Sequence, residues 1–149
     1  MATINDLVAA TNDFCIKFCN SKLNFPSWNT NDIWEFDGTI KDGNKRGCYA
    51  LLRGEEIIYV GVGIGHSTET YKGSGLGDRL KNYWIVNKGK SGEGAKMYRS
   101  RDNWSEINGI ITIGFDEENY FLAAALEVYL ITKLMPLKNR VHNSKDVIK

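Results

Sequence analysis

Apolar residues recur at helical spacing in two parts of the chain. Residues 3–20 place apolar side chains on one face, and Thr3 followed by Asp6 resembles a helix-capping box. Residues 117–135 become almost wholly apolar after their first turn, and Pro136 marks where such a helix must stop. These patterns predict an amphipathic helix near the start of the chain and a core helix near its end.

Three other runs are typical of β-strands. Residues 47–53 and 55–61 are rich in aliphatic and aromatic side chains and flank Gly54, so they predict a hairpin. Residues 109–115 form a third short run of the same kind. Between the hairpin and this third strand we expect a helix over residues 76–87 and a basic loop without periodicity over residues 88–105.

The order of these elements predicts an α+β fold with a small antiparallel β-sheet of about three strands, flanked by helices. The 149 residues suffice for one domain with a hydrophobic core, and no internal repeat or linker divides residues 1–149. We expect residues 1–45 to form an N-terminal helical extension and residues 46–139 to hold the core of the domain.

Charge is unevenly distributed although the formal net charge is only +1. Residues 72–101 contain eight Lys and Arg against two acidic residues, which favours a surface for an anionic partner. The alternative is a solvated, lysine-rich loop. Seven of these cations are candidates for contacts with a nucleic-acid backbone: Lys72, Lys81, Lys88, Lys90, Lys96, Arg99 and Arg101.

The three cysteines, Cys15, Cys19 and Cys48, lack the spacing of a metal site. An odd number of cysteines and a polar start to the chain predict a cytoplasmic protein. No apolar run reaches the length of a membrane span, since Glu127 and Lys133 interrupt the best candidate. We therefore expect no membrane partner.

The predicted hairpin displays two phenols beside two glycines. A three-residue turn centred on Gly54 would set Tyr49 opposite Tyr59 and Gly47 opposite Gly61. A phosphate or a sugar could approach such a stretch of backbone because no Cβ blocks it. The alternative is a cross-strand tyrosine pair that only stabilises the sheet.

Arg79, Tyr83 and Glu127, which follow the hairpin in the sequence, add to this chemistry. Arg79 and Tyr83 are four residues apart and would share one helix face, and a guanidinium suits a phosphate because its fork gives two parallel hydrogen bonds. Glu127 is a lone carboxylate in the apolar helix, and its burial requires either a basic partner or a divalent cation. Two tyrosines, an arginine and a glutamate are sufficient to cleave a phosphodiester.

In order and spacing these residues resemble the GIY-YIG nuclease family over residues 47–139. The segment "GCY" at 47–49 corresponds to the first signature triplet, with Cys48 in place of the usual Ile, and "YVG" at 59–61 corresponds to the second. Arg79 followed by Tyr83 matches the arginine of the family and the His or Tyr one turn later. The segment "LEVYLITKLMPLKN" resembles the helix of the family that carries the glutamate.

The resemblance implies a role for each matching residue. Tyr49 would be the general base or a relay to one, Tyr59 would position the water or the phosphate, and Arg79 would hold a non-bridging oxygen. Tyr83 would orient the phosphate, and Glu127 would bind one Mg²⁺ or Mn²⁺ ion per active site. Support of the site would fall to Gly47, Gly61 and Asn139.

The chain departs from the family in three places, the first being that residues 1–45 match nothing in its shared core. The stretch between Tyr59 and Arg79 is longer than in compact members, so residues 61–75 contain an insertion. Val62 stands where many members carry a lysine just after the second triplet. Lys72 or His66 of the inserted loop are candidates to replace that lysine.

The resemblance implies a divalent-metal-dependent endonuclease that hydrolyses DNA, of restriction type or from a phage or another mobile element. A homodimer is expected because paired cuts need two sites, and RNA stays open as a substrate. One alternative is a non-catalytic nucleic-acid-binding module with the same fold. Another is a nucleotide-binding protein. The glycines at 61, 63 and 65 argue against it, because they alternate instead of following a phosphate-loop pattern.

Overall fold

A computed structural model of the chain describes residues 1–65, 75–88 and 95–143. In chain order the elements are α1 (Ile4–Phe18), β1 (Arg46–Arg53), β2 (Glu56–Gly63), α2 (Gly75–Leu80), β3 (Trp84–Val86), β4 (Tyr98–Ser100), a 3₁₀ turn (Asp102–Trp104), β5 (Gly109–Phe115) and α3 (Leu122–Leu134). The predicted α+β class is confirmed.

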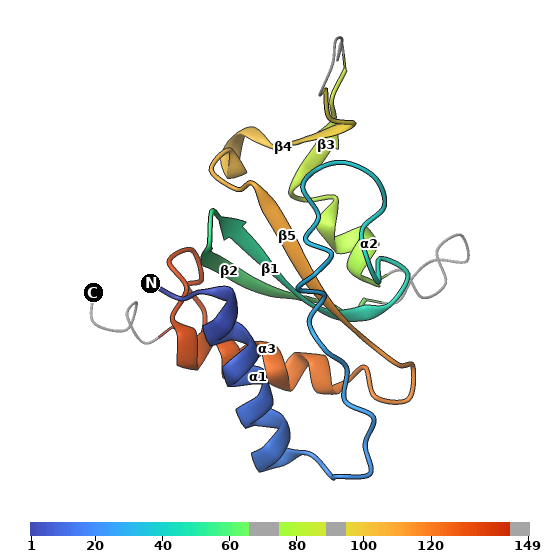
Figure 1. Cartoon of the computed structure of the whole chain (residues 1–149), viewed down its shortest axis with the longest axis vertical. Coiled ribbons are helices and arrows are strands. Elements are labelled where there is room, and N and C mark those ends of the chain that lie inside the picture. Colours follow the sequence, from blue (N-terminus) through green and yellow to red (C-terminus); the bar gives the residue numbers. More distant parts are fainter. Residues whose placement is uncertain (66–74, 89–94, 144–149) are drawn as a thin grey trace.

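An antiparallel sheet in the order β2-β1-β5 divides the molecule into two layers. Alternate residues of β1 point to opposite faces, so Cys48 and Ala50 pack with α1 and α3, whereas Tyr49 and Leu51 pack with α2. A separate two-stranded ribbon, β3–β4, lies on the α2 side (Figure 1). The sheet therefore has one face for two long helices and another for α2 and the ribbon.

The first and last helices follow the apolar pattern with small changes at their ends. The predicted capping box of α1 is present, because the Thr3 hydroxyl accepts from the Asp6 backbone N–H and the Asp6 carboxylate accepts from that of Thr3. Helix α3 begins at Leu122, five residues later than predicted. It ends where Met135 takes the left-handed conformation, with φ of 47°, just before Pro136.

The hairpin is present, but its predicted register is wrong. The turn is one residue shorter than expected, so Arg53 pairs with Glu56 and Leu52 with Ile57. A β-bulge at Ile58 then shifts the remaining pairs, which sets Tyr49 opposite Gly61.

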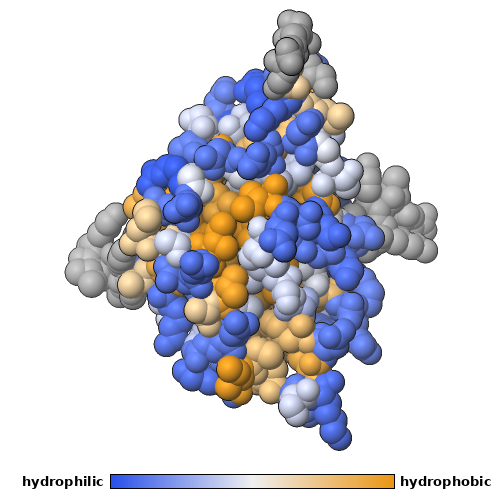
Figure 2. All heavy atoms as spheres, viewed as in Figure 1, coloured by the Kyte–Doolittle hydropathy of each residue, from blue (hydrophilic) through white to orange (hydrophobic). Residues whose placement is uncertain are grey.

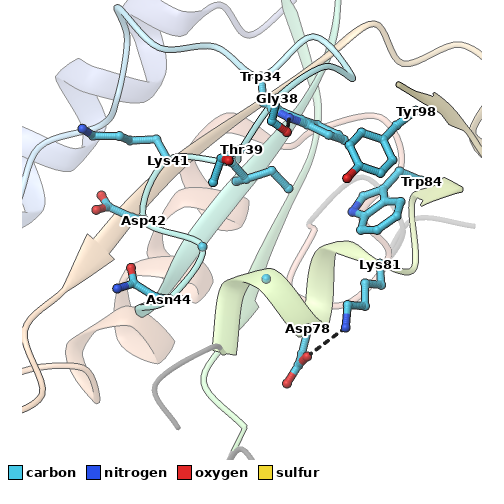
Figure 3. Close-up of a pocket in the computed structure, with 13 residues that line it drawn as sticks. Trp34, Gly38, Thr39, Lys41, Asp42, Asn44, Asp78, Lys81, Trp84 and Tyr98 are labelled. Atoms are coloured by element: carbon cyan, nitrogen blue, oxygen red, sulfur yellow. Dashed lines mark hydrogen bonds and ion pairs between the residues drawn. The ribbon is translucent and has the colours of Figure 1, made fainter. Parts of the chain in front are cut away.

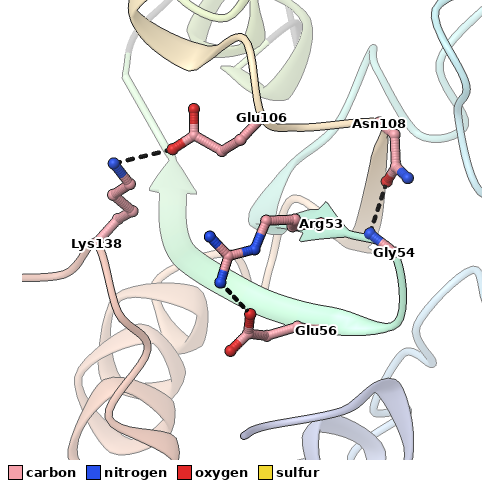
Figure 4. A network of polar contacts seen from close by, with 6 residues as sticks. All are labelled: Arg53, Gly54, Glu56, Glu106, Asn108 and Lys138. Atoms are coloured by element: carbon pink, nitrogen blue, oxygen red, sulfur yellow. Dashed lines mark hydrogen bonds and ion pairs between the residues drawn. The ribbon is translucent and has the colours of Figure 1, made fainter.

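Polar contacts fasten the tip of the hairpin to neighbouring segments. Arg53 forms an ion pair with Glu56, and the Gly54 backbone N–H donates to the Asn108 side chain (Figure 4). The bulge and these contacts fix the register of β1 against β2, which cannot be predicted by pairing residues outward from a turn centred on Gly54.

The predicted helix over residues 76–87 is wrong beyond its first half. Helix α2 stops at Leu80, a turn follows, and residues 84–86 become β3. Because Trp84, Ile85 and Val86 favour strands, pairing with residues 98–100 prevails over continuation of the helix. The expectation of an unstructured basic segment over residues 88–105 is also wrong, since it contains β4 and the 3₁₀ turn.

Residues 1–45 are packed onto the rest of the domain. The aromatic rings of Phe14 and Tyr129 join α1 to α3 with centroids 5.4 Å apart, and the Tyr129 hydroxyl donates to the Asp13 carboxylate. Further along, Trp34 pairs through its backbone with Ile110 of β5. The extension thus covers one sheet face and one sheet edge.

Hydrophilic residues cover most of the face of the molecule seen in Figure 2, and hydrophobic residues gather near the middle of that face.

In the described parts of the chain, no helix combines the length and the apolar character needed to cross a lipid bilayer. This agrees with the interruption of the apolar run by Glu127 and Lys133.

Candidate active site

Three of the predicted site residues converge on one phenolic oxygen. The hydroxyl groups of Tyr49, on β1, and Tyr83, in the turn after α2, lie 2.6 Å apart and share a hydrogen bond. The Arg79 Nε atom donates to the Tyr49 hydroxyl at 3.4 Å. Although the helix ends at Leu80, the turn returns Tyr83 to the side of Arg79, so the predicted proximity of these two residues holds for a different reason.

An aromatic cluster surrounds this hydrogen-bonded group. The Tyr59 ring stacks beside the Tyr49 ring with centroids 6.2 Å apart, and Trp104 contacts the rings of Tyr59 and Tyr83 edge-on. Trp104 was not among the predicted catalytic residues. Its place against the candidate site is set by the 3₁₀ turn, which lacks a clear sequence signal.

Burial governs the protonation of the tyrosines. The Tyr49 side chain is 0% exposed, and burial raises its pKa to about 12 in spite of its hydrogen bonds to Tyr83 and Arg79. Burial likewise holds the pKa of Tyr83 well above its usual value. The hydrogen bond to Tyr49 raises the pKa of Arg79, which therefore stays charged.

The phenols differ in their access to solvent. Tyr59 is half-buried and Arg79 is exposed, whereas Tyr49 and Tyr83 are buried. A water or a phosphate can thus reach Tyr59 and Arg79 directly. The buried Tyr49 hydroxyl holds Arg79 through a hydrogen bond, and the buried Tyr83 hydroxyl holds Tyr49 in the same way.

The predicted patch of bare backbone at Gly47 and Gly61 is wrong. A Cβ on Gly61 would collide with the Tyr49 ring, and a Cβ on Gly47 would collide with the Ile113 carbonyl oxygen. These glycines therefore make room for close packing of a ring and a strand.

Gly65, four residues beyond Gly61, is exposed and has open space around it. A cavity of about 370 Å³ beside Arg79 is lined in part by Gly63, Gly65 and Gly75. Gly63 and Gly75 approach so closely that a Cβ on either would lie 2.6 Å from the carbonyl oxygen of the other. The alternation of glycines at 61, 63 and 65 was the available signal for this cavity.

Val62, which replaces the lysine of many GIY-YIG members, also lines this cavity. The candidate replacements Lys72 and His66 lie outside the described residues. The described wall of the cavity therefore has one guanidinium, that of Arg79, and the carboxylate of Asp78, with no lysine at position 62.

Glu127 is half-buried on α3, so its predicted burial inside a core helix is wrong. A helical side chain leans toward the preceding turn, and the short side chains of Ala123 and Ala124 leave the carboxylate a route to solvent. Burial raises the pKa of Glu127, and the positive charges of His142 and Arg79 lower it in part. Within the described residues, no hydrogen bond or ion pair joins Glu127 to Arg79 or to the tyrosines.

Asn139 clamps the strand that carries Tyr59. Its side-chain oxygen accepts from the Val60 backbone N–H, and its side-chain nitrogen donates to the Val60 carbonyl, both at 2.9 Å. β2 lies at the edge of the sheet, so Asn139 takes the place of a neighbouring strand there. This geometry agrees with the supporting role expected of Asn139.

The basic residues divide between two surfaces. A groove of about 540 Å³ along the β3–β4 ribbon is lined by four of them: Lys81, Lys88, Arg99 and Arg101. Lys96 lies apart, in a cavity beside Gly54 at the hairpin turn. Lys72 and Lys90 are outside the described residues.

The described residues contain no group of three or more His, Cys, Asp and Glu side chains able to hold a metal ion. Comparison of the chain with protein-family models, curated proteins and solved structures finds no match.

Proposed function

We propose that this chain is a divalent-metal-dependent endonuclease that hydrolyses phosphodiester bonds in DNA. The observation that carries the proposal is the convergence of Arg79, Tyr49 and Tyr83 beside a glycine-lined cavity. A standalone nuclease of restriction type, or one from a phage or another mobile element, is the finer form of this proposal. Assembly into a homodimer would supply two sites for paired cuts.

Arg79 binds the scissile phosphate. Its Nε atom donates to Tyr49, which leaves the terminal nitrogens of the exposed guanidinium to face a non-bridging oxygen. The hydrogen bond to Tyr49 fixes the side chain before substrate arrives, so little order is lost when charge develops on the phosphate. The buried Tyr83 hydroxyl in turn fixes Tyr49.

Tyr59 orients the attacking water, because its hydroxyl group is on the one phenol of the three that is not buried. Tyr49 is not suited to act as a general base at neutral pH, since its pKa of about 12 leaves it protonated. Its hydroxyl holds the Arg79 side chain in place, and the proton of the attacking water leaves to solvent.

Glu127 fits a weakly held divalent cation. Mg²⁺ is often bound by one or two carboxylates, with substrate phosphate and water completing the coordination, and a half-buried carboxylate suits that arrangement. Mg²⁺ or Mn²⁺ held there would stabilise negative charge on the departing oxygen.

The groove along β3–β4 supports a contact with the DNA backbone. Four cations surround it, and Lys81 lies two residues from Arg79 on the same segment. Contacts of this kind supply affinity without sequence choice and apply equally to RNA.

A non-catalytic nucleic-acid-binding module is the second candidate. The complete burial of Tyr49 favours it, because a general base that never contacts solvent cannot activate a water directly. Nucleotide binding has weaker support, since the described glycine backbone lacks the pattern of a phosphate loop.

Plasmid nicking separates these candidates. The parent protein should convert supercoiled plasmid to nicked or linear form with Mg²⁺ and not with EDTA. Glu127→Ala should lose cleavage and keep DNA binding, whereas Glu118→Ala, a change at an exposed acidic residue outside the site, should cut like the parent. Cleavage by Glu127→Ala at the parental rate would refute the role of Glu127, and binding without cleavage by the parent would favour the binding module.

A further inference from the structure

A second cavity, of about 730 Å³, lies between the segment at 38–44 and the start of the ribbon. Three aromatic rings form one end of it: Trp84 and Tyr98 lie 4.6 Å apart between centroids, and Trp34 lies 5.6 Å from Tyr98 (Figure 3). The volume is in the range of cavities that hold small organic groups. The catalytic proposal above makes no use of this cavity.

The charged residues around the cavity balance one another. Two lysines, Lys41 and Lys81, and two carboxylates, Asp42 and Asp78, line the cavity, and the Lys81 ammonium lies 3.4 Å from the Asp78 carboxylate (Figure 3). A free phosphate would meet carboxylates as well as cations there. A neutral, planar group with hydrogen-bonding edges suits the cavity better, because it can stack on the rings and meet groups of both signs.

The indole N–H of Trp84 points to the same kind of ligand. Among the described residues it is buried and has no hydrogen-bond acceptor. Buried donors in native proteins nearly always have a partner. A ligand with acceptor atoms on its edge would supply one.

The cavity adjoins the candidate active site and the basic groove, because side chains are shared between their walls. Asp78 lines both this cavity and the one beside Arg79. Lys81 and Trp84 line both this cavity and the groove along the ribbon. A single nucleic-acid strand held by Arg79 and by the ribbon would thus pass the aromatic end of the cavity.

We propose that this cavity receives an unstacked nucleobase of the bound strand, so that the preferred substrate is DNA with an unpaired base near the cleaved bond. This inference rests on the proposed function. Bases inside a duplex expose only their edges, whereas a base that leaves the stack presents a face to aromatic rings. Duplex DNA with a fully paired sequence would leave the cavity without an occupant.

Binding measured in EDTA tests this inference without cleavage. Fluorescence anisotropy would compare three labelled duplexes of one sequence: fully paired, with a single unpaired base, and with an abasic residue at that bulge. The parent should bind the duplex with the unpaired base about 5- to 100-fold more tightly than the other two. Equal affinity for the base-containing and abasic bulges would overturn the proposal, since it would reduce the preference to DNA shape.

A substitution that fills the cavity tests the assignment, with the same substitution elsewhere as its control. Thr39 is exposed and lines the cavity, so Thr39→Trp should occupy it and abolish the preference. Thr30→Trp makes the same change at an exposed position outside the cavities described here and should retain the preference. An undiminished preference in Thr39→Trp would contradict the assignment. If the parent cleaves plasmid but shows no preference for the unpaired base, the inference about the cavity is refuted and the proposed nuclease function stands. If the parent shows the preference but does not cleave DNA, the proposed nuclease function is refuted and the inference about the cavity stands.

Discussion

The two faces of the central sheet carry different kinds of side chain. Toward α1 and α3 the sheet presents mainly aliphatic residues, such as Ala50, Ile111 and Ile113, against Leu126 and Leu130 of the last helix. Toward α2 and the ribbon it presents Tyr49 in an aromatic cluster whose hydroxyls and N–H groups need partners.

This difference separates stability from chemistry. The aliphatic face gains free energy from area removed from water and tolerates no polar group without a partner. The aromatic face buries the phenols of Tyr49 and Tyr83 and leaves Tyr59 and the Arg79 guanidinium in contact with solvent, where they can meet a ligand. Substitutions on each face test this division.

The largest effect on folding is expected at the aliphatic face. Leu126→Ala removes a side chain with 0% exposure and should lower the free energy of unfolding by about 2–5 kcal/mol, because it leaves a cavity. Urea unfolding followed by circular dichroism measures this change. Val128→Ala on the exposed side of the same helix should cost far less. A loss below 1 kcal/mol for Leu126→Ala would show that this face is not the main core.

High pH should weaken the aromatic face next. Tyr49 has a folded pKa of about 12 against an ordinary value of 10.0, so the unfolded chain releases its proton first as the pH rises. The stability that Tyr49 contributes is therefore complete below pH 10 and falls by about 2–3 kcal/mol between pH 10 and pH 12. Unfolding measured across this range should fall less steeply in Tyr49→Phe than in the parent. Identical slopes would mean that Tyr49 is not held neutral by burial.

A smaller effect is expected where a glycine admits the Tyr49 ring. In Gly61→Ala the new methyl group collides with that ring, which should cost about 1–3 kcal/mol and disturb the hydrogen bond to Tyr83. Gly65→Ala, where a Cβ would contact nothing within 4 Å, is the matched control for stability. If the two variants unfold at the same urea concentration, the ring does not lie over Gly61.

Local patterns in the sequence predicted the aliphatic face well. The capping box at Thr3, the strand over residues 109–115 and the stop before Pro136 each depend on neighbours within a few residues. The helix over residues 76–87 was wrong because β3 forms by pairing with the next strand, β4, beyond the end of the predicted helix. Such non-local pairing has no signature within a single segment.

The candidate site was predictable in its residues and not in its geometry. Tyr49, Arg79 and Tyr83 do meet, but a bulge at Ile58 altered the hairpin register. The bulge determines which glycine lies beneath the Tyr49 ring, and nothing in the apolar pattern announces it. The half-exposure of Glu127 depends on Ala123 and Ala124, one turn earlier. These alanines are visible in the sequence, but they do not decide whether Glu127 is buried or exposed until the packing of α3 is known.

Cleavage by paired arginine variants tests most directly whether the Tyr49–Arg79 group is a phosphodiesterase site. Arg79→Ala should reduce the rate of plasmid nicking in Mg²⁺ by about 100-fold or more, because it removes charge stabilisation at the phosphate. Arg53→Ala, which removes an exposed arginine at the hairpin turn, should nick at the parental rate. Equal nicking by Arg79→Ala and the parent, with both proteins folded, would contradict the account.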